Sequence, residues 1–452
     1  MKRIRSLLAL LLCALLVTGI GAAAQAEGPK PYLIDVRVGE VTLSMRAYSE
    51  SYEGNVYLSL NDLAQALRGT EKQFCVEYRA GGADGELWEL TTGKPAPAET
   101  GEKTGAPFAL SYLNLKRNRL FVDGGERRYY SYRSDEKELY LSLADLQLLL
   151  DLTIWVDSAG VLRVEPDKPF APDLYELKGE DYFSAFNAVL VGDADTGEIF
   201  FSDRRAWRCP IASVSKLMSY LLLAEAVRDG EVNADDEVTI STKAARLSWT
   251  ADGVISLSPG DKIPLRELTE AMMLASSNEC ALALAEHVAG TEEDFVARMN
   301  ERAAELGLLS ARFYTPHGLP SYGASGLPGK RQNNMSAMDL FRLSAYLLEN
   351  FPEITEITEK QFVHMEKLGF TTANSNPLVF NMPGVNGLKT GSTNRAGYCV
   401  VASLPVTVGE ETHTLVAVVL GAETADVRGQ CAEILLRAAK AHYEEEGFAP
   451  AA

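Results

Sequence analysis

Ser213 and Lys216 stand three residues apart at the start of a long apolar run that follows Pro210. Proline is tolerated near a helix start, because the first backbone N–H groups of a helix have no partners within it. A helix here would place Ser213 and Lys216 on one face. The lysine amine can then reach the serine hydroxyl, which needs a base before it acts as a nucleophile. The pair predicts acyl transfer through Ser213, although Ser-x-x-Lys alone also occurs in ordinary helix starts.

Two polar stretches further along the chain complete a set. The first is Ser276-Ser277-Asn278, and the second is Lys389-Thr390-Gly391, which Ser392 follows. Ser-x-x-Lys, Ser-x-Asn and Lys-Thr-Gly in this order are characteristic of penicillin-binding proteins and class A β-lactamases. Because three motifs in the correct order rarely arise by chance, the set favours a serine enzyme over an ordinary helix start.

The stretch from Asp193 to about Arg428 resembles the low-molecular-weight penicillin-binding proteins, the serine-type D-alanyl-D-alanine carboxypeptidases. It departs from the family pattern at Ser215, where threonine is usual, at Ser277, where glycine is usual, and at Ser392, where histidine is often found. A glycine in place of Ser277 could have φ > 0, so this change bears on the backbone of the Ser-x-Asn turn. Beyond the three motifs, the resemblance includes Asp195-Thr196-Gly197-Glu198, Leu257-Ser258-Pro259-Gly260-Asp261, Phe313-Tyr314-Thr315-Pro316-His317-Gly318-Leu319, Ala396-Gly397-Tyr398 and Val418-Val419-Leu420-Gly421-Ala422.

The resemblance implies three catalytic residues. Ser213 would be the nucleophile, Lys216 the base, and Ser276 the relay that returns a proton to the leaving amine. A free lysine has a pKa of about 10.4 and is charged at neutral pH. Burial, together with the charge of Lys389, would push Lys216 toward its neutral form. We therefore expect Lys216 to be buried.

The resemblance also implies a substrate-binding set. Asn278 would hold a substrate amide, while Lys389 and Thr390 would meet a terminal carboxylate. Gly391 would let the backbone of the ligand approach closely. The backbone N–H groups of Ser213 and Ser392 would form the oxyanion hole.

Ordinary structural roles remain possible for several of these residues. The Ser276–Asn278 stretch suits a turn between two helices, and Lys389 could be a solvated lysine on an edge strand. His287 is expected on a helix surface, and no chemistry is assigned to His317 within its family loop.

Composition narrows the class of protein. The chain has 452 residues and a formal net charge of −19, which makes nucleic acid and anionic lipid poor partners. Its five histidines lack paired ligand spacing, so neither a metal nor another cofactor is expected. The five cysteines beyond the first 26 residues are scattered, and we expect buried thiols rather than a disulfide framework. They are Cys75, Cys209, Cys280, Cys399 and Cys431.

The N-terminus has the pattern of an export signal. Lys2, Arg3 and Arg5 precede an apolar stretch, and Ala24-Gln25-Ala26 resembles a cleavage site. We expect a signal peptide over residues 1–26 and a location outside the cell, or on the cell-wall or periplasmic face. An uncleaved anchor is the alternative.

Residues 31–165 contain an internal repeat. In residues 56–67 a short β-type run leads to Ser59 and then to a helical leucine pattern, and residues 139–150 repeat this order. This predicts a smaller repeated α+β domain. It resembles the copper amine oxidase N-terminal-like domain of exported bacterial proteins, which implies an accessory module without oxidase chemistry. A wall polymer or a protein is its possible partner.

Residues 166–180, which carry three prolines, are expected to form a linker to a second domain over residues 181–447. In this domain, strands at both ends of the sequence enclose a helical middle. This predicts an α+β fold in which helices flank an antiparallel sheet and a helical subdomain is inserted, like that of β-lactamases and transpeptidases. The expected strands are 188–193, 198–201, 387–391, 398–406 and 414–421, and the expected helical segments are 213–230, 265–348 and 426–445.

The leading functional hypothesis is a D-Ala-D-Ala carboxypeptidase that acts on peptidoglycan stem peptides and is inhibited by β-lactam antibiotics. A D,D-endopeptidase that cuts peptidoglycan cross-links would use the same residues. A β-lactamase would need an acid that activates water, and no convincing Glu-x-x-Leu-Asn stretch lies between Asn278 and Lys389. A non-catalytic wall-binding protein is the third alternative.

Overall fold

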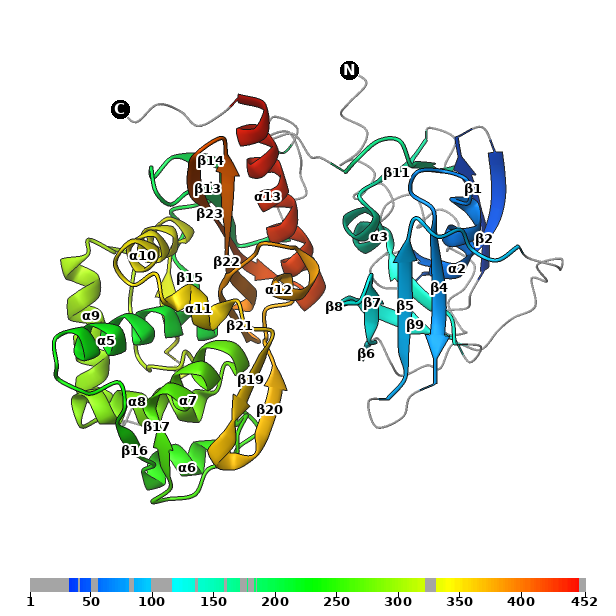
Figure 1. Ribbon diagram of the computed structural model, residues 1–452. Helices are drawn as coiled ribbons and strands as arrows, with labels where there is room; N and C mark the ends of the chain where they lie inside the picture. The colour runs from blue at the N-terminus through cyan, green and yellow to red at the C-terminus, as the bar shows by residue number, and fades with distance from the viewer. Residues whose placement is uncertain are drawn as a thin grey trace. The chain divides into compact units, whose positions relative to one another are not determined.

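The computed structural model describes residues 32–39, 41–49, 56–80, 85–98, 116–134, 137–157, 161–170, 177, 183, 185–321 and 331–446. They belong to two compact units, one ending at Tyr182 and the other beginning at Phe183 (Figure 1). The predicted signal peptide lies outside the described residues. Among the described helices, none has the length and apolar character needed to cross a membrane.

The second unit contains a five-stranded antiparallel sheet. Its strands follow the order β14-β13-β23-β22-β21, so β21 lies at one edge. The three later strands match the expected ones to within three residues at each end. The bounds are β13 (Ala188–Asp193), β14 (Ile199–Asp203), β21 (Gly387–Thr393), β22 (Gly397–Val408) and β23 (Glu411–Ala422).

Two helices cover opposite faces of this sheet (Figure 1). Side chains alternate between the two faces along each strand. Leu190 and Val418 pack in one core with side chains of α10 (Ala337–Asn350). The buried side chains of α13 (Ala425–Glu446) lie outside that core, although α13 contacts the same strands. The expected α+β fold is confirmed.

The helical subdomain is inserted between β14 and β21, as expected. At its centre lies α5 (Lys216–Arg228), which is buried on nearly all sides. The other elements are β15 (Cys209–Pro210), the 3-10 turn η3 (Ala212–Ser215), β16 (Glu237–Thr239), α6 (Thr242–Ser248), β17 (Lys262–Pro264), α7 (Leu265–Glu270), the π-helical turn η4 (Ala271–Ala275), α8 (Asn278–Ala289), α9 (Glu292–Glu305), β18 (Asn334–Met335), α10, α11 (Ile354–Thr358), β19 (Phe362–Met365), η5 (Glu366–Leu368), β20 (Phe370–Ala373) and α12 (Leu378–Asn381).

The first unit is built around the internal repeat. Strand β3 (Val56–Ser59) leads into α2 (Leu60–Ala66), and β10 (Leu139–Ser142) leads into α3 (Leu143–Leu150). The two strands pair antiparallel, with the equivalent residues Leu58 and Leu141 opposite each other. The repeat units are therefore related by a local twofold axis. Each strand ends in a serine whose hydroxyl caps the following helix.

Strands β3 and β10 are neighbours inside an eight-stranded sheet, which has the order β11-β12-β1-β2-β3-β10-β9-β6. A four-stranded sheet has the order β4-β5-β7-β8. The remaining bounds are β1 (Tyr32–Val38), β2 (Val41–Ser49), β4 (Phe74–Arg79), β5 (Leu87–Thr92), β6 (Lys116–Arg117), β7 (Leu120–Val122), β8 (Gly125–Arg127), β9 (Tyr130–Arg133), β11 (Thr153–Val156) and β12 (Leu162–Glu165).

The expected linker begins later than predicted. Phe170 is buried, and its backbone N–H donates to the carboxylate of Asp151 at 3.2 Å. The carbonyl of Pro169 accepts from the Thr153 hydroxyl at 3.3 Å. Residues 166–170 therefore belong to the packed first unit, because two of the three prolines that suggested a linker, Pro166 and Pro169, precede the buried Phe170.

Candidate active site

The chain before Ser213 makes a tight turn. Ala212 has φ +47°, in the left-handed region that non-glycine residues rarely adopt. Ser213 itself lies in the 3-10 turn η3, and the α-helix begins at Lys216, not at Ser213 as expected. The three-residue spacing still brings the pair together, since residues three apart eclipse one another in a 3-10 turn. The Nζ atom of Lys216 lies 2.9 Å from the Oγ atom of Ser213.

Lys216 is fully buried and has three polar neighbours. Besides Ser213, its Nζ atom contacts Oδ1 of Asn278 at 2.8 Å and the main-chain oxygen of His317 at 2.9 Å. These two oxygens can only accept hydrogen bonds. A neutral amine has two hydrogens, which these oxygens would take, and its lone pair would then face Ser213.

Burial lowers the pKa of Lys216 to about 7, although the negative charge of Glu279 acts in the opposite direction. A pKa near neutrality suits a general base. The expectation that Lys216 is buried is confirmed. The charge of Lys389 is not among the causes of its shift, so the dominant cause is loss of hydration.

The Ser-x-Asn stretch lies between the π-helical turn η4 and α8. Ser276 adopts the left-handed conformation with φ +62°, whereas Ser277 has φ −57°. The positive φ that we considered for position 277 is therefore at position 276. The Ser277 hydroxyl caps α8 by accepting from the backbone N–H of Cys280 at 3.1 Å, so serine at this position stabilises the turn.

This turn directs Asn278 toward Lys216. The other side of the Asn278 amide, Nδ2, donates to the main-chain oxygen of Asp252 at 2.8 Å. Ser276 is partly exposed, and its side chain makes no hydrogen bond in the part of the chain that the structure describes. The structure thus joins Asn278 to the Ser213–Lys216 pair but does not show Ser276 bonded to either.

Lys389 and Thr390 lie on the edge strand β21. Lys389 is only 1% exposed, so the alternative of a solvated edge-strand lysine is wrong. Its Nζ atom donates to the main-chain oxygen of Thr390 at 3.0 Å. Burial lowers the pKa of Lys389 well below its usual value, and the charges of Lys216 and Arg428 act in the same direction.

Gly391 follows on the same strand and lies against the turn that carries Ser213. A Cβ atom at position 391 would lie 2.8 Å from the backbone nitrogens of both Ser213 and Val214. The chain itself therefore requires glycine at this position, and the space for a ligand that we expected there stays a prediction. The next residue, Ser392, is exposed and pairs with Tyr398 of β22.

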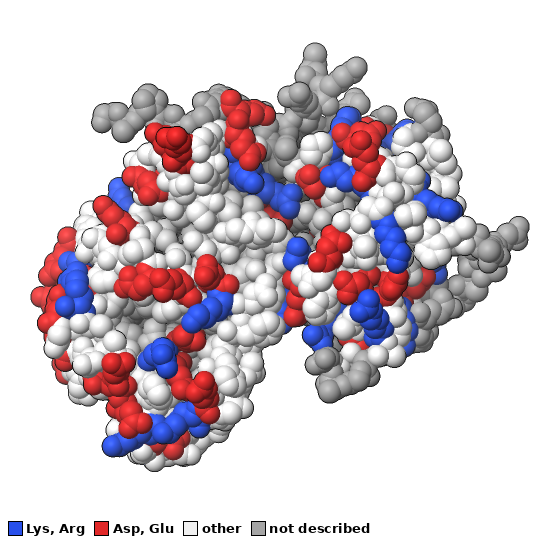
Figure 2. Space-filling view, in the orientation of Figure 1, with Lys and Arg blue, Asp and Glu red and all other residues white. Residues whose placement is uncertain are grey.

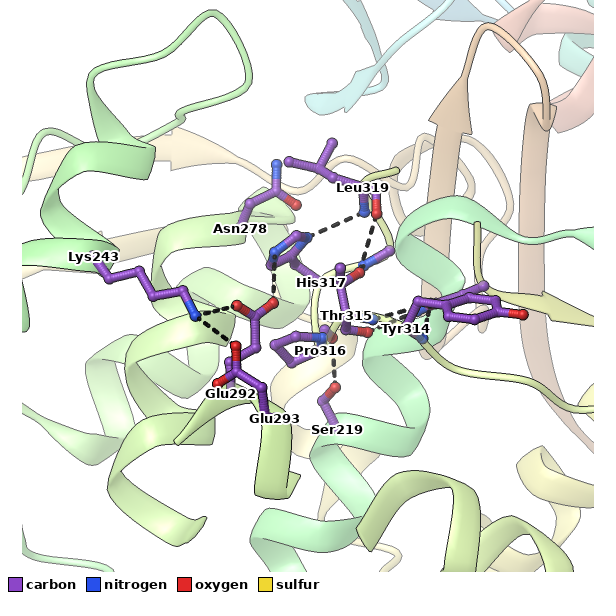
Figure 3. Close-up of polar contacts among 12 residues, drawn as sticks. Ser219, Lys243, Asn278, Glu292, Glu293, Tyr314, Thr315, Pro316, His317 and Leu319 are labelled. Atoms are coloured by element: carbon purple, nitrogen blue, oxygen red, sulfur yellow. Dashed lines mark hydrogen bonds and ion pairs between the residues drawn. The ribbon is translucent and has the colours of Figure 1, made fainter. Parts of the chain in front are cut away.

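Sequence reasoning missed the role of the loop around His317 (Figure 3). The main-chain oxygen of His317 lies 2.9 Å from Nζ of Lys216 and 3.3 Å from Oγ of Ser213. Gly318 has φ +91°, and a Cβ atom there would lie 2.0 Å from the main-chain oxygen of Ala212. The loop thus supports both catalytic candidates through backbone atoms.

The His317 imidazole is held in its neutral form. Burial, together with the charges of Lys216 and Lys243, lowers its pKa to about 3. Its Nδ1 atom accepts from the backbone N–H of Leu319 at 3.1 Å, which leaves the proton on Nε2. Nε2 lies 3.6 Å from Glu292, whose carboxylate pairs with Lys243 at 2.7 Å (Figure 3). Because the His317 ring is neutral, it adds no positive charge next to the amine of Lys216.

Among the described residues, Asp193, Asp195 and His413 are close enough together to hold a metal ion. One oxygen of Asp193 accepts from Nδ1 of His413 at 2.6 Å and from the Tyr443 hydroxyl at 2.5 Å. The other oxygen accepts from the backbone N–H of Asp195 at 2.8 Å. Because both oxygens have protein partners, this cluster ties α13 to the sheet rather than pointing to a metal.

The cysteines follow the sequence analysis, and the visible surface carries charges of both signs. On the face seen in Figure 2, acidic and basic side chains are interspersed, with no broad area of Lys and Arg. The five cysteines expected as buried thiols are all buried and unpaired. His287 is partly exposed on α8 and lies 3.0 Å from a carboxylate oxygen of Asp236.

Comparison with known proteins gives consistent matches for the second unit. Residues 177–424 match the protein family described as D-alanyl-D-alanine carboxypeptidase. D-alanyl-D-alanine carboxypeptidase DacF of Bacillus subtilis (strain 168) is 33% identical over 262 residues, which cover 58% of this chain and 63% of that protein. The chain spans between 60% and 65% of the length of the first curated relatives that it matches.

Among the solved structures that resemble this chain are two with a TM-score of 0.50. One is a peptidoglycan synthesis regulatory factor (PBP3) from Streptococcus pneumoniae, which is 29% identical, and the match covers 58% of this chain and 73% of that one. The other is penicillin binding protein 5 from Haemophilus influenzae, which is 27% identical, with 56% of this chain and 70% of that one covered. Both matches agree with the sheet and the inserted helical subdomain described above.

Proposed function

Because the chain belongs to the D-alanyl-D-alanine carboxypeptidase family, we propose that it removes the terminal D-alanine from peptidoglycan stem peptides through an acyl-enzyme on Ser213. The observation that carries this proposal is the 2.9 Å contact between Ser213 and a fully buried Lys216. A serine hydroxyl is a weak nucleophile until a base takes its proton. A lysine whose pKa is about 7 can be that base at neutral pH.

Each step then has a group to perform it. Lys216 takes the hydroxyl proton of Ser213 while the Ser213 oxygen attacks the carbonyl carbon of the penultimate residue of the substrate. The backbone N–H groups of Ser213 and Ser392 would stabilise the oxyanion. Ser276 would pass the proton to the leaving amine, and the C–N bond breaks to release D-alanine. Lys216 would then take a proton from water as the water oxygen attacks the ester, and would return this proton to Ser213 as the bond between the Ser213 oxygen and the acyl carbon breaks.

The proposed substrate set lies around this centre. Asn278 would hold a substrate amide, and Lys389 and Thr390 would bind the terminal carboxylate. The lowered pKa of Lys389 fits this role, since an arriving carboxylate favours the charged ammonium and the two would pair as the ligand binds. Gly391 would keep the strand close to Ser213 and to the ligand.

A β-lactam contains an acylating amide and a carboxylate, so the same groups would accept it. Penicillin binding protein 5 from Haemophilus influenzae, whose structure is similar, carries penicillin binding in its name. We therefore propose β-lactam antibiotics as inhibitors that acylate Ser213.

The test uses a fluorescent penicillin and a diacyl peptide ending in D-Ala-D-Ala. The protein should become labelled, mass spectrometry should place the adduct on the peptide that contains Ser213, and free D-alanine should appear. Ser202→Ala in β14 is the control, because the Ser202 hydroxyl makes no hydrogen bond among the described residues. Labelling that persists in Ser213→Ala would contradict the assignment.

The same experiment separates the other hypotheses. Release of D-alanine from linear peptides indicates a carboxypeptidase, whereas cleavage of cross-linked dimers alone indicates a D,D-endopeptidase. Rapid loss of the penicillin adduct would indicate a β-lactamase, and absence of any adduct a non-catalytic wall-binding protein.

For the first unit we propose an accessory role without chemistry of its own. The paired repeat described above supports a separate α+β module, and its resemblance to copper amine oxidase N-terminal-like domains remains a prediction. A wall polymer or a protein partner would place the enzyme on its substrate. The basic and apolar N-terminal residues support export to the extracellular, cell-wall or periplasmic face.

A further inference from the structure

Ser375 faces the proposed carboxylate-binding strand from outside the three sequence motifs. It lies in the loop between β20 and α12. Its Oγ atom is 2.6 Å from the Oγ1 atom of Thr390, and its backbone N–H donates to the main-chain oxygen of Leu274 at 2.8 Å. Ser375 therefore bridges β21 and the π-helical turn that leads to Ser276.

Two buried asparagines fix this loop. Asn374 donates through Nδ2 to the main-chain oxygens of Thr358 at 3.0 Å and Lys360 at 2.9 Å. On the other side, Asn376 donates through Nδ2 to the main-chain oxygen of Gly387, at the start of β21, at 3.0 Å. Both side chains are buried, whereas Ser375 between them is partly exposed. The backbone of Ser375 is thus held on both sides, while its hydroxyl contacts Thr390.

A bound carboxylate would decide which hydroxyl donates in the hydrogen bond between Ser375 and Thr390. Each hydroxyl has one proton to donate, and in the free protein either partner can be the donor. An ionised carboxylate only accepts. If Thr390 donates its proton to a bound carboxylate, it must accept from Ser375. A carboxylate therefore orders a chain in which Ser375 donates to Thr390 and Thr390 donates to the ligand.

We propose that Ser375 is a positioning residue that selects substrates with a free terminal carboxylate by fixing the proton of Thr390. This inference rests on the proposed function, because it takes Thr390 as the carboxylate-binding residue. A neutral terminal carboxamide both donates and accepts, so it does not impose this order and gains less from Ser375.

The test compares a diacyl peptide ending in D-Ala-D-Ala with the same peptide as its C-terminal amide. In Ser375→Ala, the ratio of kcat/KM for the acid to kcat/KM for the amide should fall about 3- to 10-fold, the effect of losing one ordinary hydrogen bond. Thr412→Ala is a matched control. It removes a hydroxyl pair of the same kind, Thr407 with Thr412 at 2.8 Å, at the far end of the β22–β23 hairpin, and its ratio should not change.

A double-mutant cycle tests whether Ser375 acts through Thr390. In a Thr390→Val background, Ser375→Ala should leave the ratio unchanged. Equal losses on acid and amide would mean a general structural effect and would overturn the proposal. An undiminished effect of Ser375→Ala in the Thr390→Val background would mean direct contact with the ligand and would also overturn it.

Failure of the proposed function gives a different result. If the wild-type protein cleaves neither peptide and forms no penicillin adduct, the proposed function is wrong, and this inference is wrong with it. A wild-type protein that cleaves the acid, with an unchanged ratio in Ser375→Ala, would remove this inference alone.

Discussion

Gly391 and Ser213 are separated by more than a hundred and seventy positions in the sequence, yet a single methyl group on Gly391 would lie 2.8 Å from the backbone nitrogen of Ser213. The third motif thus packs directly on the first. Contact is made with backbone atoms, which cannot rotate away as a flexible side chain would. The placement of the proposed nucleophile therefore depends on the absence of a side chain on β21.

Gly391→Ala should damage both stability and acylation. Overpacking of this kind typically costs about 1–3 kcal/mol, and displacing a reacting group by about 1 Å can cost about 10²-fold in rate. We expect a lower Tm and at least this loss in penicillin acylation. Gly429→Ala in α13 is the control, because its Cβ would have no contact closer than 3.6 Å. If Gly391→Ala were acylated at the wild-type rate, the turn that carries Ser213 would have to move aside without loss of activity, and this prediction would be wrong.

Lys216→Arg should lower the rate of penicillin acylation by about 10²-fold or more, the scale of losing a general base. Arginine keeps the positive charge but does not release its proton in this pH range. Stopped-flow measurement of adduct formation gives the rate. Lys262→Arg, an exposed position on β17, should acylate normally. An arginine variant as fast as wild type would exclude proton transfer by Lys216.

The pH dependence of acylation should follow Lys216. Its neutral form is the base, so the rate should rise through a pKa of about 7 and level off above it. The charge of Glu279 raises this pKa, while its Oε1 atom accepts from the backbone N–H of Val254 at 2.9 Å. Glu279→Gln keeps an oxygen acceptor and removes the charge, so the midpoint should move to lower pH.

Glu286→Gln on the same helix is the control for this shift, because Glu286 is not among the groups that change the pKa of Lys216. A midpoint that stays in place in Glu279→Gln, or that moves to higher pH, would show that the carboxylate does not act on Lys216.

Tyr443→Phe should destabilise the second unit. The Tyr443 hydroxyl donates to the buried carboxylate of Asp193 at 2.5 Å, and a hydrogen bond to a charged group contributes about 1.5–3 kcal/mol. Burial alone would raise the pKa of Asp193, but hydrogen bonds, those from His413 and Tyr443 foremost, outweigh it and lower this pKa below its usual value. The carboxylate therefore stabilises the fold above that value, and this contribution is lost as pH falls through the lowered pKa.

Urea unfolding at pH 7 and in acid tests this expectation. The difference between wild type and Tyr443→Phe should be largest at pH 7 and should shrink in acid, where Asp193 becomes protonated. Tyr314→Phe is the control, because no hydrogen bond of its hydroxyl occurs among the described residues. A difference that does not vary with pH would argue against the role of the charge.

A protein that begins at Asp173 should fold, bind penicillin and release D-alanine from a small peptide at nearly the full rate. All three motifs lie in the unit that begins at Phe183, and a unit with its own core can usually fold alone. On intact cell walls the full chain should be faster if the first unit places the enzyme on its substrate. Loss of small-peptide activity in a folded truncated protein would assign part of the active site to the first unit.

Short-range patterns in the sequence were sufficient to predict much of the fold. The strands expected at 398–406 and 414–421 are observed as β22 and β23, and the last helix, expected at 426–445, is α13. Alternation and helical periodicity act over a few residues, so they can be read without the tertiary structure. The hairpin of β19 and β20 was not predicted, because each strand is only four residues long and lacks clear alternation.

For the site, the sequence by itself determined the chemical groups, since the residue types and order of the three motifs are visible in it. The tertiary structure alone decided how they are supported. The oxygen of His317 that contacts Lys216 is a main-chain atom. Every residue has such an oxygen, so the residue type at position 317 does not reveal the contact. The contacts of Gly391 with Ser213 and of Ser375 with Thr390 join segments that meet only when the subdomain packs on the sheet. Such contacts are set by the packing of whole elements, and spacing along the chain does not encode them.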